Sequence, residues 1–272
     1  MADWLQPELT TVALCWRLDR RDGVSLGFTA HDRDLEIGGI IYRAAPGMLP
    51  SAISLSDGLE IDTLDVSGAL THDAIREQDL AAGRWDGARV RLFAVDWTDP
   101  DDDVLPLARG ELGDVETRDG AFTAELSGPT ALLEQPVVEY TSPECRAELG
   151  DRRCQVDMAA RRRLVPVIEA VDAVTIRVAT DEDVADAYGY GRLRWIDGAN
   201  AGLASAILSS EGDRLILREA PPYPMEAGVL VEIAHGCDKS LATCAGRFGN
   251  AVNFRGEPWL PGNDLLTRYP GA

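Results

Sequence analysis

The chain has 272 residues, which is enough for one large or two modest domains. Hydrophobic residues make up 45% of it, so we expect a packed core and exclude a wholly disordered protein. The 26 basic and 46 acidic residues give a net charge of −20. Such a surface repels phosphates and argues against sequence-specific binding of DNA or RNA.

The sequence also bears on location. No apolar run approaches the 18 or more residues that a membrane-spanning helix needs. The start, Met1-Ala2-Asp3-Trp4, lacks the basic and apolar blocks of a signal peptide. We therefore expect no membrane insertion, and a chain that stays in the cytoplasm until some assembly leaves the cell.

The first half of the chain reads as short strands joined by tight turns. Residues 11–18 alternate between apolar and polar, and Asp22-Gly23, Gly38-Gly39 and Asp119-Gly120 are typical hairpin turns. Helices are expected at about 73–82 and shortly after Pro129. The predicted strands are 11–18, 24–28, 35–37, 40–42, 90–97, 111–117 and 121–126.

The second half contains a charged segment and then more strands. Residues 145–163 are rich in arginine and are expected to be partly helical. The tail from His235 onward is rich in Gly, Pro and Asn and has little periodicity. Strands are predicted at 174–178, 192–196, 203–208, 215–217 and 229–233. Many evenly spaced strands with few helices predict a mainly β fold of barrels or sandwiches.

Four of the five cysteines form two pairs. Eight residues separate Cys145 from Cys154, and six separate Cys237 from Cys244. The 82 residues between Cys154 and Cys237 look like a self-contained β module. If that module closes on itself its ends meet, and four thiolates converge as a Cys₄ zinc site or an iron–sulfur cluster requires. Disulfides are not expected in a cytoplasmic chain.

The residues beside these cysteines favour a metal or cluster site, but they do not distinguish zinc from an iron–sulfur cluster. Positive charge that lowers the pKa of the thiols is expected from Arg146, Arg152, Arg153 and Lys239, and close backbone approach to sulfur from Gly236 and Gly246. The spacing is wider than in zinc ribbons and matches neither ferredoxin pattern. Spacing alone therefore leaves open a zinc site, a cluster or four unrelated thiols.

Other candidate residues have structural explanations. Cys15 is expected to be a small strand residue, and His235 is a weaker candidate for a ligand. The pairs His31-Asp32 and His72-Asp73 lie beside a turn or helix start, where these residue types fit structurally. The acidic stretch 99–103 lacks the glycine and the glutamate of a calcium loop, so a solvated loop is expected.

Several motifs resemble one known family. They are the segments 145–154, 236–239, 244–250, 253–258 and 260–264, together with residues 26–35 near the N-terminus. The sequence resembles a family of prophage proteins that includes the hub protein of gene transfer agents, and more distantly the tail tip protein L of lambda-like phages. The resemblance covers essentially the whole chain.

The resemblance implies a structural role at the tail tip of a phage-like particle. It implies a tail-tube-like β-domain over residues 1–138, and a C-terminal region 139–272 with a small β-barrel at about 166–234 and an iron–sulfur segment at 139–165 plus 235–272. The implied ligands of a 4Fe–4S cluster are Cys145, Cys154, Cys237 and Cys244, with zinc as the alternative metal.

The same resemblance implies the assembly. The family forms a homotrimeric ring between a distal tail protein ring and a central fibre or spike protein, and DNA passes through the lumen without specific binding. The alternative is an iron–sulfur redox enzyme, although the chain lacks the three closely spaced cysteines of radical enzymes that use S-adenosylmethionine. An enzyme should have a deep pocket beside the cluster, whereas a hub should have a large ring interface.

Overall fold

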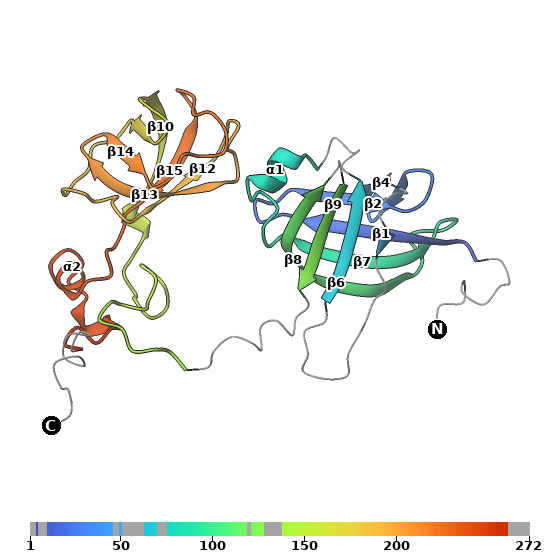
Figure 1. Ribbon diagram of the computed structural model, residues 1–272, viewed down its shortest axis with the longest axis horizontal. Coiled ribbons are helices and arrows are strands. Elements are labelled where there is room, and N and C mark those ends of the chain that lie inside the picture. The colour runs from blue at the N-terminus through green and yellow to red at the C-terminus, as the bar shows by residue number, and fades with distance from the viewer. Residues whose placement is uncertain are drawn as a thin grey trace. The chain divides into compact units, whose positions relative to one another are not determined.

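The computed structural model describes residue 4 and residues 10–45, 49–50, 63–69, 75–118, 121–127 and 138–260. The chain divides into two compact units, unit 1 over Met1–Val137 and unit 2 over Val138–Ala272. Both are built mainly from strands (Figure 1), which confirms the mainly β prediction. Among the described residues, no helix is long and apolar enough to cross a membrane.

The described residues of unit 1 form a sheet of nine strands. Its order is β3-β4-β2-β1-β7-β8-β9-β6-β5, with all neighbours antiparallel except the parallel pair β2 and β4. The strands are β1 (Val12–Asp19), β2 (Ser25–Thr29), β3 (Leu35–Ile37), β4 (Ile40–Ala44), β5 (Leu49–Pro50), β6 (Thr63–Ala69), β7 (Arg89–Asp96), β8 (Val104–Arg118) and β9 (Ala121–Ser127).

The alternation in β1 gives this sheet a core on each face. Trp16 and Leu18 point to one side, where they pack in a cluster with Leu80 of the short helix α1 (Glu77–Ala81). Ala13 and Cys15 point to the other side and pack with Tyr42, among others. Successive strand residues face opposite sides of a sheet, so one alternating strand contributes to both clusters.

Unit 2 is built on a closed barrel with the strand order β10-β11-β14-β13-β12-β15. Alternate residues fill its interior, where Trp195, Leu193 and Ile233 are almost fully buried. Closure removes exposed sheet edges. The strands are β10 (Arg162–Ala170), β11 (Thr175–Val178), β12 (Arg192–Trp195), β13 (Ala204–Glu211), β14 (Arg214–Leu217) and β15 (Leu230–Ala234).

The predicted helices were partly wrong. Residues 145–163 are irregular, with a 3₁₀ turn at Ala159–Arg161, and their last residues already belong to β10. An unpredicted helix, α2 (Leu241–Gly246), lies in the tail. The helix predicted at 73–82 is shorter, and the one predicted after Pro129 lies outside the described residues.

Replacing Trp195 should strongly destabilise the barrel. The indole is 1% exposed, and its Nε1 donates to Ser205 Oγ at 3.0 Å. Trp195→Ala should lower the free energy of unfolding by about 3–5 kcal/mol, because it leaves a cavity and an unpaired hydroxyl. Ile196→Ala is the matched control: that side chain is 40% exposed, and its loss should cost less than about 0.5 kcal/mol. Denaturant unfolding measures both, and equal losses would contradict this assignment of the core.

Candidate functional site

The closed barrel brings its two flanking segments together. Strands β10 and β15 pair from Arg162 opposite Ala234 to Pro166 opposite Leu230. The chain therefore enters and leaves the barrel at the same place, and the two flanking segments lie side by side below it (Figure 1). This confirms the prediction that the module closes and its ends meet.

Hydrogen bonds join the segment of the first cysteine pair to that of the second. The Cys145 N–H donates to the Lys239 carbonyl at 2.9 Å, and the Arg146 N–H donates to the Arg255 carbonyl at 3.2 Å. Farther along, the Glu257 N–H donates to the Ser142 carbonyl at 2.7 Å. These hydrogen bonds hold the tail against the first cysteine segment as far as Glu257.

An aspartate turn positions Cys154. Oδ1 of Asp151 accepts from the N–H groups of Arg153 at 2.8 Å and Cys154 at 2.6 Å, while Oδ2 accepts from the Glu148 N–H at 3.0 Å. Gln155 then turns back with a φ of 63°. An aspartate that binds its own backbone competes with helix formation, which explains why the predicted helix is absent here.

Helix α2 positions Cys244. The Ser240 side chain caps the helix by accepting from the Thr243 N–H at 3.1 Å, and Asp238 accepts from the Thr243 hydroxyl at 2.8 Å. Cys244 is the buried residue of this helix. The cap is recognisable in the sequence, because a serine followed by a run of helix-forming residues is a helix start.

Three of the four thiols have a hydrogen-bond donor. The Arg255 N–H donates to Cys145 Sγ at 3.3 Å, and the Lys239 N–H donates to Cys237. Asn250 Nδ2 lies 3.7 Å from Cys154 Sγ. Such N–H groups stabilise negative charge on sulfur and are the usual partners of cluster ligands.

The charges of neighbouring thiols raise the pKa of two of the four cysteines. The pKa of Cys244 is raised first by burial, and then by the charges of Cys145, Cys237 and Cys154. Burial likewise raises the pKa of Cys237, while the Lys239 N–H opposes that shift. Four thiolates brought together without a cation repel one another, and a bound cation reverses the effect.

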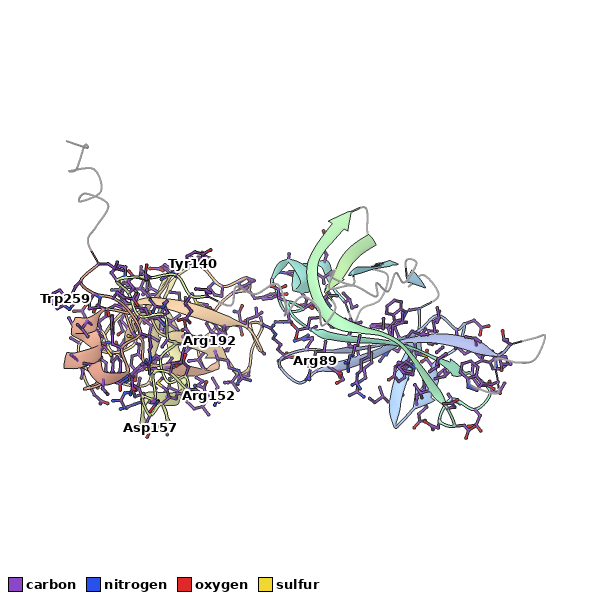
Figure 2. All side chains as sticks on the ribbon, turned by 90° about the horizontal axis from the view of Figure 1, so that it is seen from below. Arg89, Tyr140, Arg152, Asp157, Arg192 and Trp259 are labelled. Atoms are coloured by element: carbon purple, nitrogen blue, oxygen red, sulfur yellow. The ribbon has the colours of Figure 1, made fainter. Side chains whose placement is uncertain are left out.

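The pKa values of Cys237 and Cys244 are raised overall, so the predicted net lowering by nearby cations was wrong for these two thiols, although the charge of Lys239 does lower the pKa of Cys237. Carboxylates also pair with the cations: Arg146 and Arg153 pair with Glu139, and Lys239 Nζ pairs with Glu148 and donates to the Ala147 carbonyl. Arg152 is exposed on the surface of unit 2 (Figure 2). Burial of the sulfurs dominates instead.

The two glycines also differ from their predicted role. A Cβ on Gly236 would lie 1.9 Å from the Gly189 carbonyl oxygen and 2.2 Å from the Gly191 nitrogen. A Cβ on Gly246 would meet nothing within 4 Å. Gly236 thus allows the backbone of residues 189–191 to lie close to it, and this contact is with backbone atoms and not with sulfur. Nothing lies close to Gly246, so a glycine is not needed there for a close approach.

The four cysteines of unit 2 are the candidate ligands of a thiolate-bound cofactor. All five cysteines are free thiols, and the four of unit 2 are buried or half-buried. Within the described residues, no three or more His, Cys, Asp or Glu side chains are grouped so that they could hold a single metal ion. At a zinc site all four sulfurs lie about 2.3 Å from one metal ion, whereas each thiolate ligand of a 4Fe–4S cluster binds a different iron.

The other candidate residues, Cys15, His235 and His31, have structural contacts. Cys15 is fully buried in the core of unit 1, 3.5 Å from Thr29 Oγ1, which confirms its role as a strand residue. His235 packs edge-on against Tyr188 with a centroid distance of 5.1 Å, and burial lowers its pKa. His31 lies 3.2 Å from Asp32.

Two further candidates lie in the first half of the sequence. The acidic residues 99–103 are mostly exposed, as predicted for a solvated loop, and Asp101 accepts from the Gly38 N–H at 2.8 Å. His72 and Asp73 lie outside the described residues.

Known families match both parts of the chain. Residues 1–157 match the model described as "Baseplate hub protein, N-terminal attachment domain". The chain belongs to the baseplate hub protein family. This hub-family match includes Cys145 and Cys154, while residues 186–264, with Cys237 and Cys244, match "Phage conserved hypothetical protein BR0599".

A solved structure is similar to this chain over nearly its whole length. A chain of the "Virion of native gene transfer agent (GTA) particle" is 39% identical, with a TM-score of 0.84. The match covers 98% of this chain and 94% of the other. A comparison with curated proteins gives no match. The suspected resemblance to the hub family is confirmed.

The salt bridge that fastens the tail should depend on pH. Arg146 donates from Nη1 to Glu257 Oε2 at 2.6 Å and from Nη2 to Oε1 at 2.8 Å. The Arg146 hydrogen bonds lower the pKa of Glu257 to about 2. Because the folded-state pKa is depressed, the stabilisation is complete above the unfolded value of 4.5 and disappears as the pH falls through about 2.

Hydrogen exchange of the Ser142 amide, which donates to Glu257 Oε2 at 2.9 Å, can measure this dependence. We expect its protection to fall between pH 4.5 and about 2, and Glu257→Gln to remove that pH dependence. Protection that falls equally in both proteins would contradict the assignment.

Proposed function

We propose that this chain is a structural baseplate hub of a particle of the gene transfer agent or siphophage type, and not an enzyme. The observation that carries the proposal is the 39% identity over 98% of the chain to a component of a gene transfer agent virion. The match of residues 1–157 to the hub attachment domain supports the same role. The protein would assemble in the cytoplasm and then reside at the tail tip of the particle.

In this proposal Cys145, Cys154, Cys237 and Cys244 hold a 4Fe–4S cluster, with zinc as the alternative. The support is the effect of neighbouring thiols on the pKa of Cys237 and Cys244, together with the N–H donors to three of the four sulfurs. When bound, the group would supply binding free energy to folding, as a structural metal does. The chain's own hydrogen bonds already join the two flanking segments, from the Cys145 N–H to the Lys239 carbonyl, and join the second segment to the barrel, from the Gly236 N–H to the Ala187 carbonyl.

The proposed assembly is a homotrimeric ring between a distal tail protein ring and a central fibre or spike protein. Cyclic closure gives each copy the same neighbours and prevents open-ended association. DNA that crosses such a ring must slide without binding, and a positive wall would hold phosphates strongly. The net charge of −20 per chain supports a neutral or acidic wall.

An electron-microscopy reconstruction of the assembled particle tests this function. We expect three copies in a closed ring whose inner surface is dominated by Asp and Glu. The isolated protein should bind duplex DNA negligibly at physiological salt. A monomer attached outside the tail, or an arginine-lined lumen, would contradict the proposal.

A further inference from the structure

Asn250 is a buried amide that contacts a cysteine of each pair. Its side chain is 9% exposed, and Nδ2 donates to the Cys154 carbonyl at 2.6 Å and to Cys154 Sγ at 3.7 Å. The Asn250 N–H donates to the Cys244 carbonyl at 2.9 Å. One residue thus links the aspartate turn of Cys154 to helix α2.

The neighbours fix the orientation of this amide. The Cys154 carbonyl can only accept, so it requires the NH₂ group of Asn250 rather than the oxygen. On the other side, Asn250 Oδ1 accepts from Asn253 Nδ2 at 2.8 Å. An amide flip would place oxygen against oxygen at Cys154. A donor therefore faces the sulfur of Cys154.

We propose that Asn250 is a positioning residue for the thiolate of Cys154, holding this sulfur toward the bound cluster through its side-chain N–H. The inference rests on the proposed function. Cys154 and Cys244 are the two buried thiols of the site, where water cannot supply a donor. A donor to the sulfur withdraws electron density from the iron–sulfur bond and stabilises the thiolate.

Asn250 also gives the most direct experimental access to these donors. The donors to Cys145 and Cys237 are backbone N–H groups of Arg255 and Lys239, which a side-chain substitution does not remove. The donor to Cys154 belongs to a side chain. Asn250→Leu removes it at similar volume and adds no charge.

The experiment compares the resonance Raman spectra of cluster-loaded wild type and Asn250→Leu, both purified without oxygen. We expect the iron–sulfur(Cys) stretching band to move to higher frequency in the variant, because a hydrogen bond to sulfur weakens that bond. The cluster should also be lost about fivefold faster in air, since the thiolate is held less firmly.

Asn200→Leu is the matched control. Asn200 is 2% exposed in the barrel, and its Nδ2 donates to the Tyr223 carbonyl at 2.9 Å, so the substitution removes a similar buried bond. It should lower stability without moving the Raman band. Asn250→Ala, which loses the donor without adding a charge, should move the band in the same direction as Asn250→Leu.

The possible results separate this inference from the proposed function. Wild-type protein without iron and sulfide would contradict the cluster itself. A loaded wild type whose Raman band and rate of cluster loss are unchanged in Asn250→Leu would contradict only the role of Asn250. Failure of both Asn250 variants to fold, under conditions in which Asn200→Leu folds, would also overturn that role, because Asn250 would then serve folding alone.

Discussion

Cys154→Ser should abolish cluster incorporation and release the two segments that flank the barrel. Serine cannot supply the thiolate, and Cys154 is one of the two buried thiols of the site, held between the aspartate turn and Asn250. Structural metal–thiolate sites contribute on the order of 10 kcal/mol to folding, so the loss should be large. Iron analysis and hydrogen exchange measure the two effects.

The effect should be confined to part of unit 2. The barrel has its own core of interior residues, so strands β10–β15 should keep their protection against exchange. Amides of residues 142–155 and 237–257 should lose theirs. Cys15→Ser is the control, because that thiol lies in the core of unit 1 and should leave the iron content unchanged. Loss of iron in Cys15→Ser would show that the ligand assignment is wrong.

Gly236→Ala should disrupt the site without altering any cysteine. The added Cβ would clash with the backbone of residues 189–191, which cannot move aside as a flexible side chain would. The Gly236 N–H also donates to the Ala187 carbonyl at 3.0 Å, so the clash falls within a fixed contact. We expect a loss of about 3 kcal/mol in the free energy of unfolding and a lower iron content, because Cys237 follows directly.

Gly246→Ala provides the comparison for this prediction. Gly246 lies at the end of α2, two residues after Cys244, and its added Cβ would meet nothing within 4 Å. Alanine favours a helix over glycine by up to about 1 kcal/mol, so this variant should be as stable as the wild type or slightly more stable. Equal iron loss in both glycine variants would contradict the proposed contact between Gly236 and the loop.

Patterns local in sequence predicted most of the strands. The alternation in residues 11–18 and the glycine turns depend on neighbouring residues only, and they correspond to β1 through β4. Strand β10 was missed altogether, because Arg162 and Arg163 continue a run of arginines and Pro166 lacks an N–H. Pairing with β15 overrides both signals, and that pairing is not local.

The cysteine site was predictable in part. Because β10 and β15 close the barrel, the spacing of Cys154 and Cys237 predicted correctly that their segments meet. The donors to Cys145 and Cys154 could not be predicted, since Arg255 and Asn250 reach their sulfurs from more than 90 residues away in the chain. The direction of the thiol pKa shifts depends on how deeply each sulfur is buried and on which carboxylates pair with the nearby arginines. Both depend on the tertiary structure and cannot be read from the sequence.

The most direct test of the central claim is the metal and sulfide content of the full chain purified without oxygen, together with its visible spectrum. We predict about four iron and four sulfide per chain and a broad absorbance that Cys154→Ser lacks. Stoichiometric zinc in a colourless protein would contradict the cluster while keeping the four-thiolate site. Protein with neither metal, folded over residues 138–260, would contradict the site altogether.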